Sequence, residues 1–308
     1  MTEGTIWKQI LAFSIPLVLG NLLQEMYNTV DSIIVGNYVG SSALAAVSAG
    51  TSLINLLIAF SQGTAVGAGV VIAQYLGAGD KKKVEASVHT SLAISILLGM
   101  ILSVLGVVFG EEVLGWMRTP AEVMPAAVSY FRLYSVGLVF NIIYNMAAGI
   151  LNAAGNAKTS LWYLGIASIT NIILDFVLIR GIQMGIEGAA LATDISQALS
   201  CVLAMIFLVR TKESYQVVLR KIRFQKNMAK KIIRLGLPAG IQNMVVSLSN
   251  VIIQSSVNGF GADVMAGFGA YLKIDGFNIM PIRSFAMAGT TFTGQNYGAG
   301  KMKRVRQG

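Results

Sequence analysis

Eight apolar segments alternate with short polar segments along the chain, and each is long enough to cross a bilayer. A helix needs roughly 20 residues to span the hydrocarbon core. The predicted spans are 10–35, 43–76, 88–109, 124–151, 159–179, 186–209, 232–262 and 264–297. Two stretches, Ala43–Leu76 and Leu235–Ala262, contain no charged residue. The pattern therefore predicts an all-α polytopic membrane protein.

The composition agrees with this prediction and excludes other classes. Of 308 residues, 55% are apolar and 12% charged, against ~25% charged in soluble domains. A disordered chain, a coiled coil and an ordinary soluble domain are therefore excluded. The single cysteine, Cys201, excludes a disulfide framework. The single histidine, His89, cannot form a metal cluster alone, so we expect a structural role for it.

The positive charges predict the orientation of the spans. The net charge is +9, and eighteen of the 23 Lys and Arg residues fall on one side of the predicted spans. They lie near the N-terminus, in the loops after the second, fourth and sixth spans, and after the eighth span. Because Lys and Arg collect in cytoplasmic loops, we expect a multi-pass cell membrane protein with a cytoplasmic N-terminus. This distribution explains the charge without a nucleic-acid partner. The first nine residues lack the features of a signal peptide, so we expect the first span to be retained.

An internal repeat divides the chain into two copies. The segment Ala73–Gly79, with the sequence AQYLGAG, recurs 221 residues later as Gly294–Gly300, with the sequence GQNYGAG. At the same offset Asn37–Gly40 matches Asn258–Gly261. With a slip of one residue, Pro16 matches Pro238 and Asn21 matches Asn243. Six spans separate the copies, so both enter the membrane from the same side, a design found in transporters with two rocking halves.

The two copies differ in length, which predicts the domain organisation. We expect a six-helix N-lobe at 1–209, a basic cytoplasmic linker at 210–231 and a partial C-lobe with two helices at 232–308. Compared with the first copy, the second lacks about four helices. The sequence therefore predicts a truncated two-lobe chain.

Polar residues within the spans are candidates for function, because ionisable groups at bilayer depth are costly. Asp31 lies in the first span, Asn171 and Asp175 are four residues apart in the fifth, and Thr193 lies in the sixth. Two carboxylates, an amide and a hydroxyl form an oxygen-rich pocket that suits a hard cation or protons. The alternative is that these groups only form hydrogen bonds between helices.

Enzymatic chemistry finds little support in the sequence. The chain lacks a P-loop, a histidine-rich metal set and a convincing Ser/His/Asp set. A membrane aspartyl protease would need a Gly-x-Gly-Asp element, whereas Asp175 stands in Ile-Ile-Leu-Asp-Phe. We therefore expect a protein that is not an enzyme.

Several motifs resemble those of the MATE (multidrug and toxic compound extrusion) transporters. In the first copy these are Pro16, Gln24, Tyr27, Asp31 and Gly36, followed by Gln74–Gly79. The segments Ala153–Lys158, Gly188–Thr193 and Gly294–Ala299 are also similar to the family pattern. The resemblance covers the whole chain. It implies a V-shaped MATE-like fold with two six-helix lobes.

The resemblance also implies a function. Such transporters exchange Na⁺ or H⁺ for organic, often cationic, compounds, with no other cofactor. The family's cation site corresponds here to Asp31, Asn171, Asp175 and Thr193, with Na⁺ or H⁺ as the coupling ion. The resemblance implies a supporting polar network, in which we place Gln24, Tyr27, Tyr130, Asn145 and Asp194. The complete protein is then expected to act as a monomer in the bilayer on small organic substrates.

Two alternatives remain. A flippase for lipid-linked sugars shares this two-lobe architecture but needs basic residues facing the cavity, and only Arg132, Lys273 and Arg283 are candidates within the spans. A non-transporting membrane scaffold would not need the Asp31 and Asp175 pair.

One residue departs from the family pattern. Asp194 stands at a position where many members of the family have an apolar residue.

Overall fold

The structure is a computed structural model that describes residues 1–117, 119–258 and 262–308, leaving aside the side chains of 41–42, 52, 250–251, 254–258, 262–270 and 272–274. The regular structure of the described residues is helical, which confirms the all-α prediction. The helices are α1 (Ile6–Tyr38), α2 (Ser41–Gly77), α3 (Lys81–Trp116), α4 (Met124–Ala153), α5 (Ala157–Asp175), η1 (Phe176–Gly181), α6 (Ile186–Arg210), η2 (Leu219–Lys221), α7 (Lys226–Asn258), α8 (Ala262–Gly298) and α9 (Met302–Gln307).

The predicted spans correspond to the long helices. Within the described residues, six helices are long and apolar enough to cross a membrane: α1, α2, α3, α4, α5 with η1, and α6. Helices α7 and α8 have 33 and 37 residues, so their length also suits a span. Part of each contains side chains outside the described set, and their two spans stay predictions. Of the matched segment Asn258–Gly261, residues 259–261 and the side chain of Asn258 lie outside the described residues, as does the side chain of Lys273.

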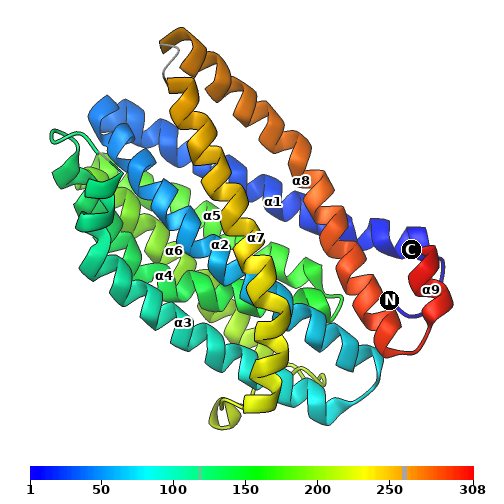
Figure 1. Ribbon diagram of the computed structural model, residues 1–308. Helices are drawn as coiled ribbons and strands as arrows, with labels where there is room; N and C mark the ends of the chain where they lie inside the picture. Colours follow the sequence, from blue (N-terminus) through cyan, green and yellow to red (C-terminus); the bar gives the residue numbers. More distant parts are fainter. Residues whose placement is uncertain (118, 259–261) are drawn as a thin grey trace.

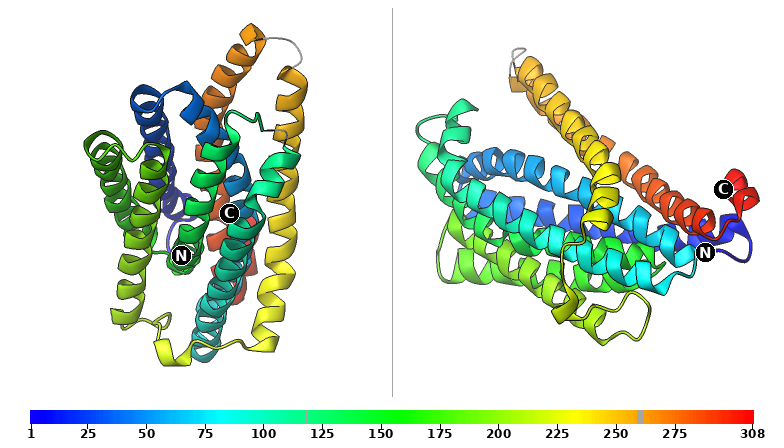
Figure 2. Two further views of the ribbon diagram at one scale, coloured as in Figure 1. Left: turned by 90° about the vertical axis from the view of Figure 1, so that its left-hand side faces the viewer. Right: turned by 60° about the horizontal axis from the view of Figure 1, so that its bottom comes forward.

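The first six helices form one bundle, and α7 and α8 pack on one side of it (Figure 1). Within the bundle α4 packs against α2, α3 and α6, which explains why so many of its side chains are buried. Helix α7 crosses α2, and α8 packs against α1 and α2. The start of α8 and the end of α7 stand away from the bundle, whereas both chain termini lie together at the other end (Figure 2). We call this other end the terminal end.

The basic segment between the copies is packed against the first bundle, contrary to what a linker-like composition suggests. Tyr215 and Val217 are buried in the apolar core. The backbone N–H of Val218 donates to Nε2 of His89 at 2.9 Å, and Nδ1 of His89 lies 2.7 Å from the carbonyl of Glu85. His89 is therefore a buried structural histidine, as the sequence predicts.

Helices α2 and α7 cross with their backbones in contact. Gly63 and Gly67 on α2 face Gly240 and Gly236 on α7, and a Cβ atom on Gly63 or Gly67 would overlap the backbone of the other helix. Both pairs have the Gly-x-x-x-Gly spacing, which places small residues on one helix face and lets membrane helices approach closely. The glycine spacing therefore sets the distance between the two copies at this crossing.

The repeated Gly-Ala-Gly segments meet each other in space. A Cβ atom on Gly77 would overlap the carbonyl of Gln295, and one on Gly298 would overlap the carbonyl of Gln74. These contacts are reciprocal, because residues 74 and 77 correspond to 295 and 298 at the offset of 221. The repeat inferred from sequence is thus also a spatial repeat, related by an approximate two-fold axis between α2 and α8.

Candidate functional site

The candidate site lies between α1, α5 and α6 in the first bundle, where α5 packs against both neighbours. Asp31 comes from α1, Asn171 and Asp175 from α5, and Thr193 from α6. Asn171, Asp175 and Thr193 are 1%, 0% and 8% exposed, and Asp31 is half-buried. The spacing of four residues puts Asn171 and Asp175 on one face of α5, as expected. The fold therefore brings side chains from three helices to one buried place.

The polar atoms of this site have few partners. Asn171 Nδ2 donates to Thr193 Oγ1 at 3.4 Å, and Thr193 Oγ1 donates to the Ala189 carbonyl at 3.0 Å. The carboxyl groups of Asp31 and Asp175 lie close enough to influence each other electrostatically. Among the described residues, one oxygen of Asp31, both oxygens of Asp175 and Asn171 Oδ1 are buried and accept no hydrogen bond. Such acceptors are costly unless a proton, water or cation satisfies them.

A small cavity adjoins Asn171 and Thr193. Its volume is about 10 Å³, close to the smallest that holds one water molecule. It is lined by Tyr27, Leu164, Ala167, Ser168, Asn171, Thr193, Ser196 and Gln197. Most of these residues are polar, but the surface they turn toward the cavity is mainly apolar, so the size of the cavity rather than its polarity restricts it to a single small guest.

The backbone changes geometry directly after Asp175. Helix α5 ends at this residue and continues as the π-helical turn η1, in which the N–H of Ile182 bonds the carbonyl of Val177 at 2.9 Å. Wide turns of this kind are rare and are often found at functional sites. The predicted fifth span, 159–179, continues past Asp175 without a break. An apolar pattern cannot distinguish an α-helix from a π-helical turn.

The predicted supporting residues are only partly brought together. Tyr27 is 8% exposed, lines the cavity, and has Gln24 and Gln197 as polar neighbours. Tyr130 on α4 is 4% exposed, within electrostatic range of both Asp31 and Asp175.

The other two supporting residues, Asn145 and Asp194, make their contacts with α4. Asn145 donates to the side chain of Asn141, one turn away on α4, at 2.7 Å. Asp194 contacts the backbone of Gly137 on α4, because its position directly after Thr193 turns it to another helix face. Gly137 has no Cβ, and this leaves room for the carboxyl group. Asn145 and Asp194 therefore belong to the contacts of α4.

Sequence reasoning missed Ser168, Ser196 and Gln197. Gln197 is 6% exposed, and its Oε1 is a further buried acceptor without a partner among the described residues. The spacing held a usable signal, because Gln197 follows Thr193 by four residues on α6.

A larger cavity of about 910 Å³ lies nearer the terminal end, between α2, α7 and α8. Lys231 and Arg234 line it, and Lys231 Nζ donates to the Tyr75 hydroxyl at 2.6 Å. Its two basic groups make it a poor place for an organic cation. It is therefore distinct in charge from the carboxylate site.

Long apolar helices, a spatial repeat and buried carboxylates together define a polytopic membrane protein of the transporter class. Comparison with known proteins identifies the family. The MatE family model matches residues 16–177 and 238–307, so the chain belongs to the MATE transporter family.

Curated relatives and solved structures agree with this family. The probable multidrug resistance protein YoeA of Bacillus subtilis (strain 168) is 33% identical, with 99% of this chain and 68% of the relative covered. Multidrug export protein MepA of Staphylococcus haemolyticus is 26% identical, with coverages of 88% and 60%. An outward-facing multidrug resistance MATE family transporter has a TM-score of 0.91 at 28% identity, with coverages of 99% and 68%. A MOP superfamily transporter from Pyrococcus furiosus, described with a binding pocket of reverse polarity, gives the same values. The chain thus spans about two thirds of these proteins.

Proposed function

We propose that the complete protein is a cation-coupled antiporter that exports organic, often cationic, compounds by alternating access, with Na⁺ or H⁺ as the coupling ion. The observation that carries the proposal is the group of buried acceptor oxygens at Asp31, Asn171 and Asp175 that lack partners among the described residues. The names of the relatives, which include multidrug resistance and multidrug export proteins, support the substrate class.

The chemistry of the site fits both coupling ions. Carboxylate, amide and hydroxyl oxygens are ligands of hard cations. A proton shared by Asp31 and Asp175 would equally relieve the repulsion between two buried carboxylates. Asn171 and Thr193 contribute neutral oxygens, and Tyr27 and Tyr130 keep the site dry and fixed in place.

Ion binding drives transport only if the ion prefers one access state. An ion shifts a conformational equilibrium by its difference in affinity between the two states. The π-helical turn after Asp175 and the two-copy architecture supply elements that can differ between states. Two buried carboxylates on separate helices would bind the ion in the state that brings α1 and α5 together.

The test is Asp31→Asn in the full-length transporter, with Glu25→Gln as the matched control. Both change an acid on α1, but Glu25 lies six residues away on another helix face. We expect Asp31→Asn to abolish efflux of a dye cation driven by a Na⁺ or H⁺ gradient, and Glu25→Gln to retain it. Removing the ion should also lower the melting temperature of the unchanged protein and leave that of Asp31→Asn unaltered. Efflux that survives in Asp31→Asn would contradict the proposal.

A second candidate is a flippase for lipid-linked sugars, favoured by one observation. Lys231 and Arg234 supply basic groups at a large cavity, as a pyrophosphate would require, whereas Arg132 is paired with Glu111 at 2.9 Å. Lys231→Ala with Arg234→Ala would abolish lipid flipping under this alternative. Under the antiporter proposal the double variant retains ion-driven dye efflux.

A further inference from the structure

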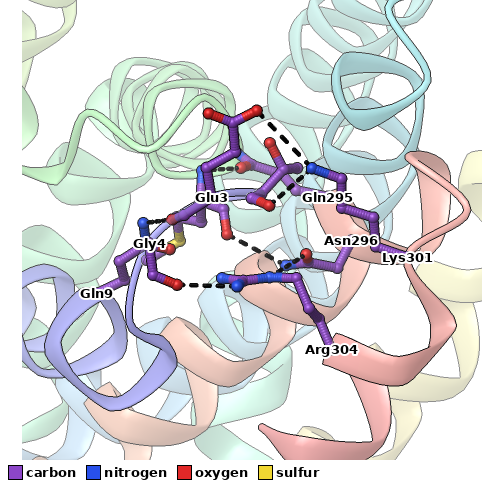
Figure 3. Close-up of polar contacts among 9 residues, drawn as sticks. Glu3, Gly4, Gln9, Gln295, Asn296, Lys301 and Arg304 are labelled. Carbon is purple, nitrogen blue, oxygen red and sulfur yellow. Dashed lines mark hydrogen bonds and ion pairs between the residues drawn. The ribbon is translucent and has the colours of Figure 1, made fainter.

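The N-terminal residues Met1–Gly4 form a strap that runs from α1 onto the end of α8 and onto α9. Figure 3 shows the polar contacts around this strap. On the side of the first copy, Gln9 of α1 donates to the Glu3 carbonyl. On the side of the second copy, the contacts are made by the side chains of Gln295, Asn296, Lys301 and Arg304. The strap is therefore held by both copies.

The second copy holds the strap mainly through its backbone carbonyls. Arg304 Nη1 donates to the Gly4 carbonyl at 2.8 Å, and Lys301 Nζ to the Thr2 carbonyl at 3.0 Å. Arg304 Nε donates to Asn296 Oδ1 at 3.1 Å, and Asn296 Nδ2 lies 3.3 Å from the Met1 carbonyl. Lys301 also lies 3.9 Å from the carboxylate of Glu3. Hydrogen bonds with a charged donor are the stronger kind.

Gln295 joins this strap to the core of the first copy. Its Nε2 donates to the carbonyl of Ala153, the last residue of α4, at 2.7 Å. Its Oε1 accepts from the Met1 amino group at 2.8 Å. A single side chain of the second copy, 6% exposed, thus contacts two separate parts of the first copy.

These contacts cover the place where the repeated glycine segments meet. Beneath the strap, Gly298 and Gly77 lie against the other helix, and Ala288 packs with Phe13 and Leu17 at 0% exposure. The contact between Gly77 and Gly298 and the facing backbones offers little apolar area to hold the two helices together. The charged contacts of the strap therefore supply attraction where the helix contact itself supplies little.

We propose that the strap Met1–Gly4, together with Gln295, Asn296, Lys301 and Arg304, is a latch that holds the two copies closed at the terminal end. We call it the terminal latch. It must release before that end of the molecule can open. Its role in transport rests on the proposed alternating access, but its existence can be tested without transport.

The test measures the alkylation of two thiols in native membrane vesicles with N-ethylmaleimide, followed by mass spectrometry. Ala288→Cys places one thiol in the contact between α1 and α8. The native Cys201, 5% exposed, lies in the core of the first copy and serves as the internal control. Separation of the copies exposes only the first thiol, whereas unfolding exposes both.

We expect Arg304→Ala to raise the alkylation rate at position 288 about tenfold, the factor that follows from losing one charge-assisted hydrogen bond. The rate at Cys201 should not change. Arg306→Ala is the matched control, because Arg306 is exposed on the same short helix α9. It should leave both rates unchanged.

Two results would overturn the proposal: equal rates in Arg304→Ala and Arg306→Ala, or a parallel rise at both thiols. If Arg304→Ala yields no folded protein, Lys301→Ala decides, because Lys301 is a second charged donor of the latch with a side chain that is 39% exposed. It should also raise the rate at position 288 about tenfold, because it too loses one charge-assisted hydrogen bond to the strap, and no rise would overturn the proposal. The Asp31→Asn efflux test can fail without affecting this assay, because alkylation needs no ion gradient.

Discussion

The two copies contact each other along two helix crossings that the repeat makes equivalent, yet the crossings are built differently. Between α2 and α7, Gly63 and Gly67 bring the backbones together. At the equivalent positions, 221 residues later, α8 carries Ser284 and Ala288. These contact α1 through side chains, with Asn21 Nδ2 donating to Ser284 Oγ at 3.0 Å.

This difference assigns different roles to the two crossings. Backbone contact between glycines allows no change in distance without loss of packing. Contact through serine, alanine and a hydrogen bond tolerates small shifts, because side chains can adjust. The α1–α8 crossing also carries the terminal latch, whose polar contacts can exchange with water. We infer that α2 and α7 stay together while α1 and α8 adjust.

The largest expected effect comes from filling the tighter crossing. Gly67→Ala places a methyl group on the backbone of Gly236 and should destabilise the protein by about 1–3 kcal/mol. The matched control is Gly69→Ala on the same helix, where a Cβ atom would lie at an ordinary 3.6 Å from the Gly149 carbonyl. It should change stability by less than about 1 kcal/mol. Thermal unfolding in detergent measures both, and equal losses would show that the crossing is not as tight as described.

A smaller effect is expected at the adjustable crossing. Ser284→Ala removes the hydrogen bond with Asn21 and should cost about 0.6 kcal/mol, a typical value for polar contacts between membrane helices. Thr290→Ala is the control, because Thr290 is exposed and bonds the carbonyl of Ala286 in its own helix. The comparison between the crossings fails if Ser284→Ala costs as much as Gly67→Ala in the same assay.

The smallest effect concerns the turns that follow the repeated glycine segments. Asp80 caps α3 by accepting from the N–H of Lys83 at 3.1 Å, whereas the second copy has Lys301 at this position. The Lys83 ammonium group holds the pKa of Asp80 below its usual value. The stabilisation that ionised Asp80 contributes through Lys83 is therefore fully present above the usual carboxyl pKa of ~3.9. It is lost as pH falls through the lower pKa that Asp80 has in the folded protein. In Asp80→Asn, the melting temperature should therefore fall slightly less on acidification than in the unchanged protein. Thermal unfolding between about pH 3 and pH 6, roughly the range in which carboxyl groups titrate, measures this. The same fall in both proteins would contradict the prediction.

Much of the fold and part of the site could be predicted from sequence, for physical reasons. Bilayer thickness imposes a minimum length on each span, so the helices followed from apolar segments. Asp31, Asn171 and Asp175 followed from the cost of polar groups in hydrocarbon and from helical spacing. These signals are local, and each can be recognised without knowing which helices pack together.

The remaining features depend on contacts between distant segments. The π-helical turn after Asp175 has the composition of an ordinary span. Gln197 becomes informative only when α5 and α6 enclose a cavity. Residues 210–231 are predicted to be a linker because they are polar, but Tyr215 and Val217 are buried in the core of the first copy and α7 already begins at Lys226. The terminal latch joins residues nearly 300 positions apart, which no local pattern predicts.

The binding of His89 to the segment between the copies has a mechanical consequence. Val218 is fixed to His89, and Lys221 Nζ is paired with Glu85 at 2.7 Å, so the chain is anchored to α3 until just before α7 begins at Lys226. Only Ile222–Gln225 separates that anchor from the second copy. A connection this short leaves the second copy little freedom to translate and makes the start of α7 a pivot. The part of α7 near Lys226 is therefore the part of the second copy that is least free to separate from the first.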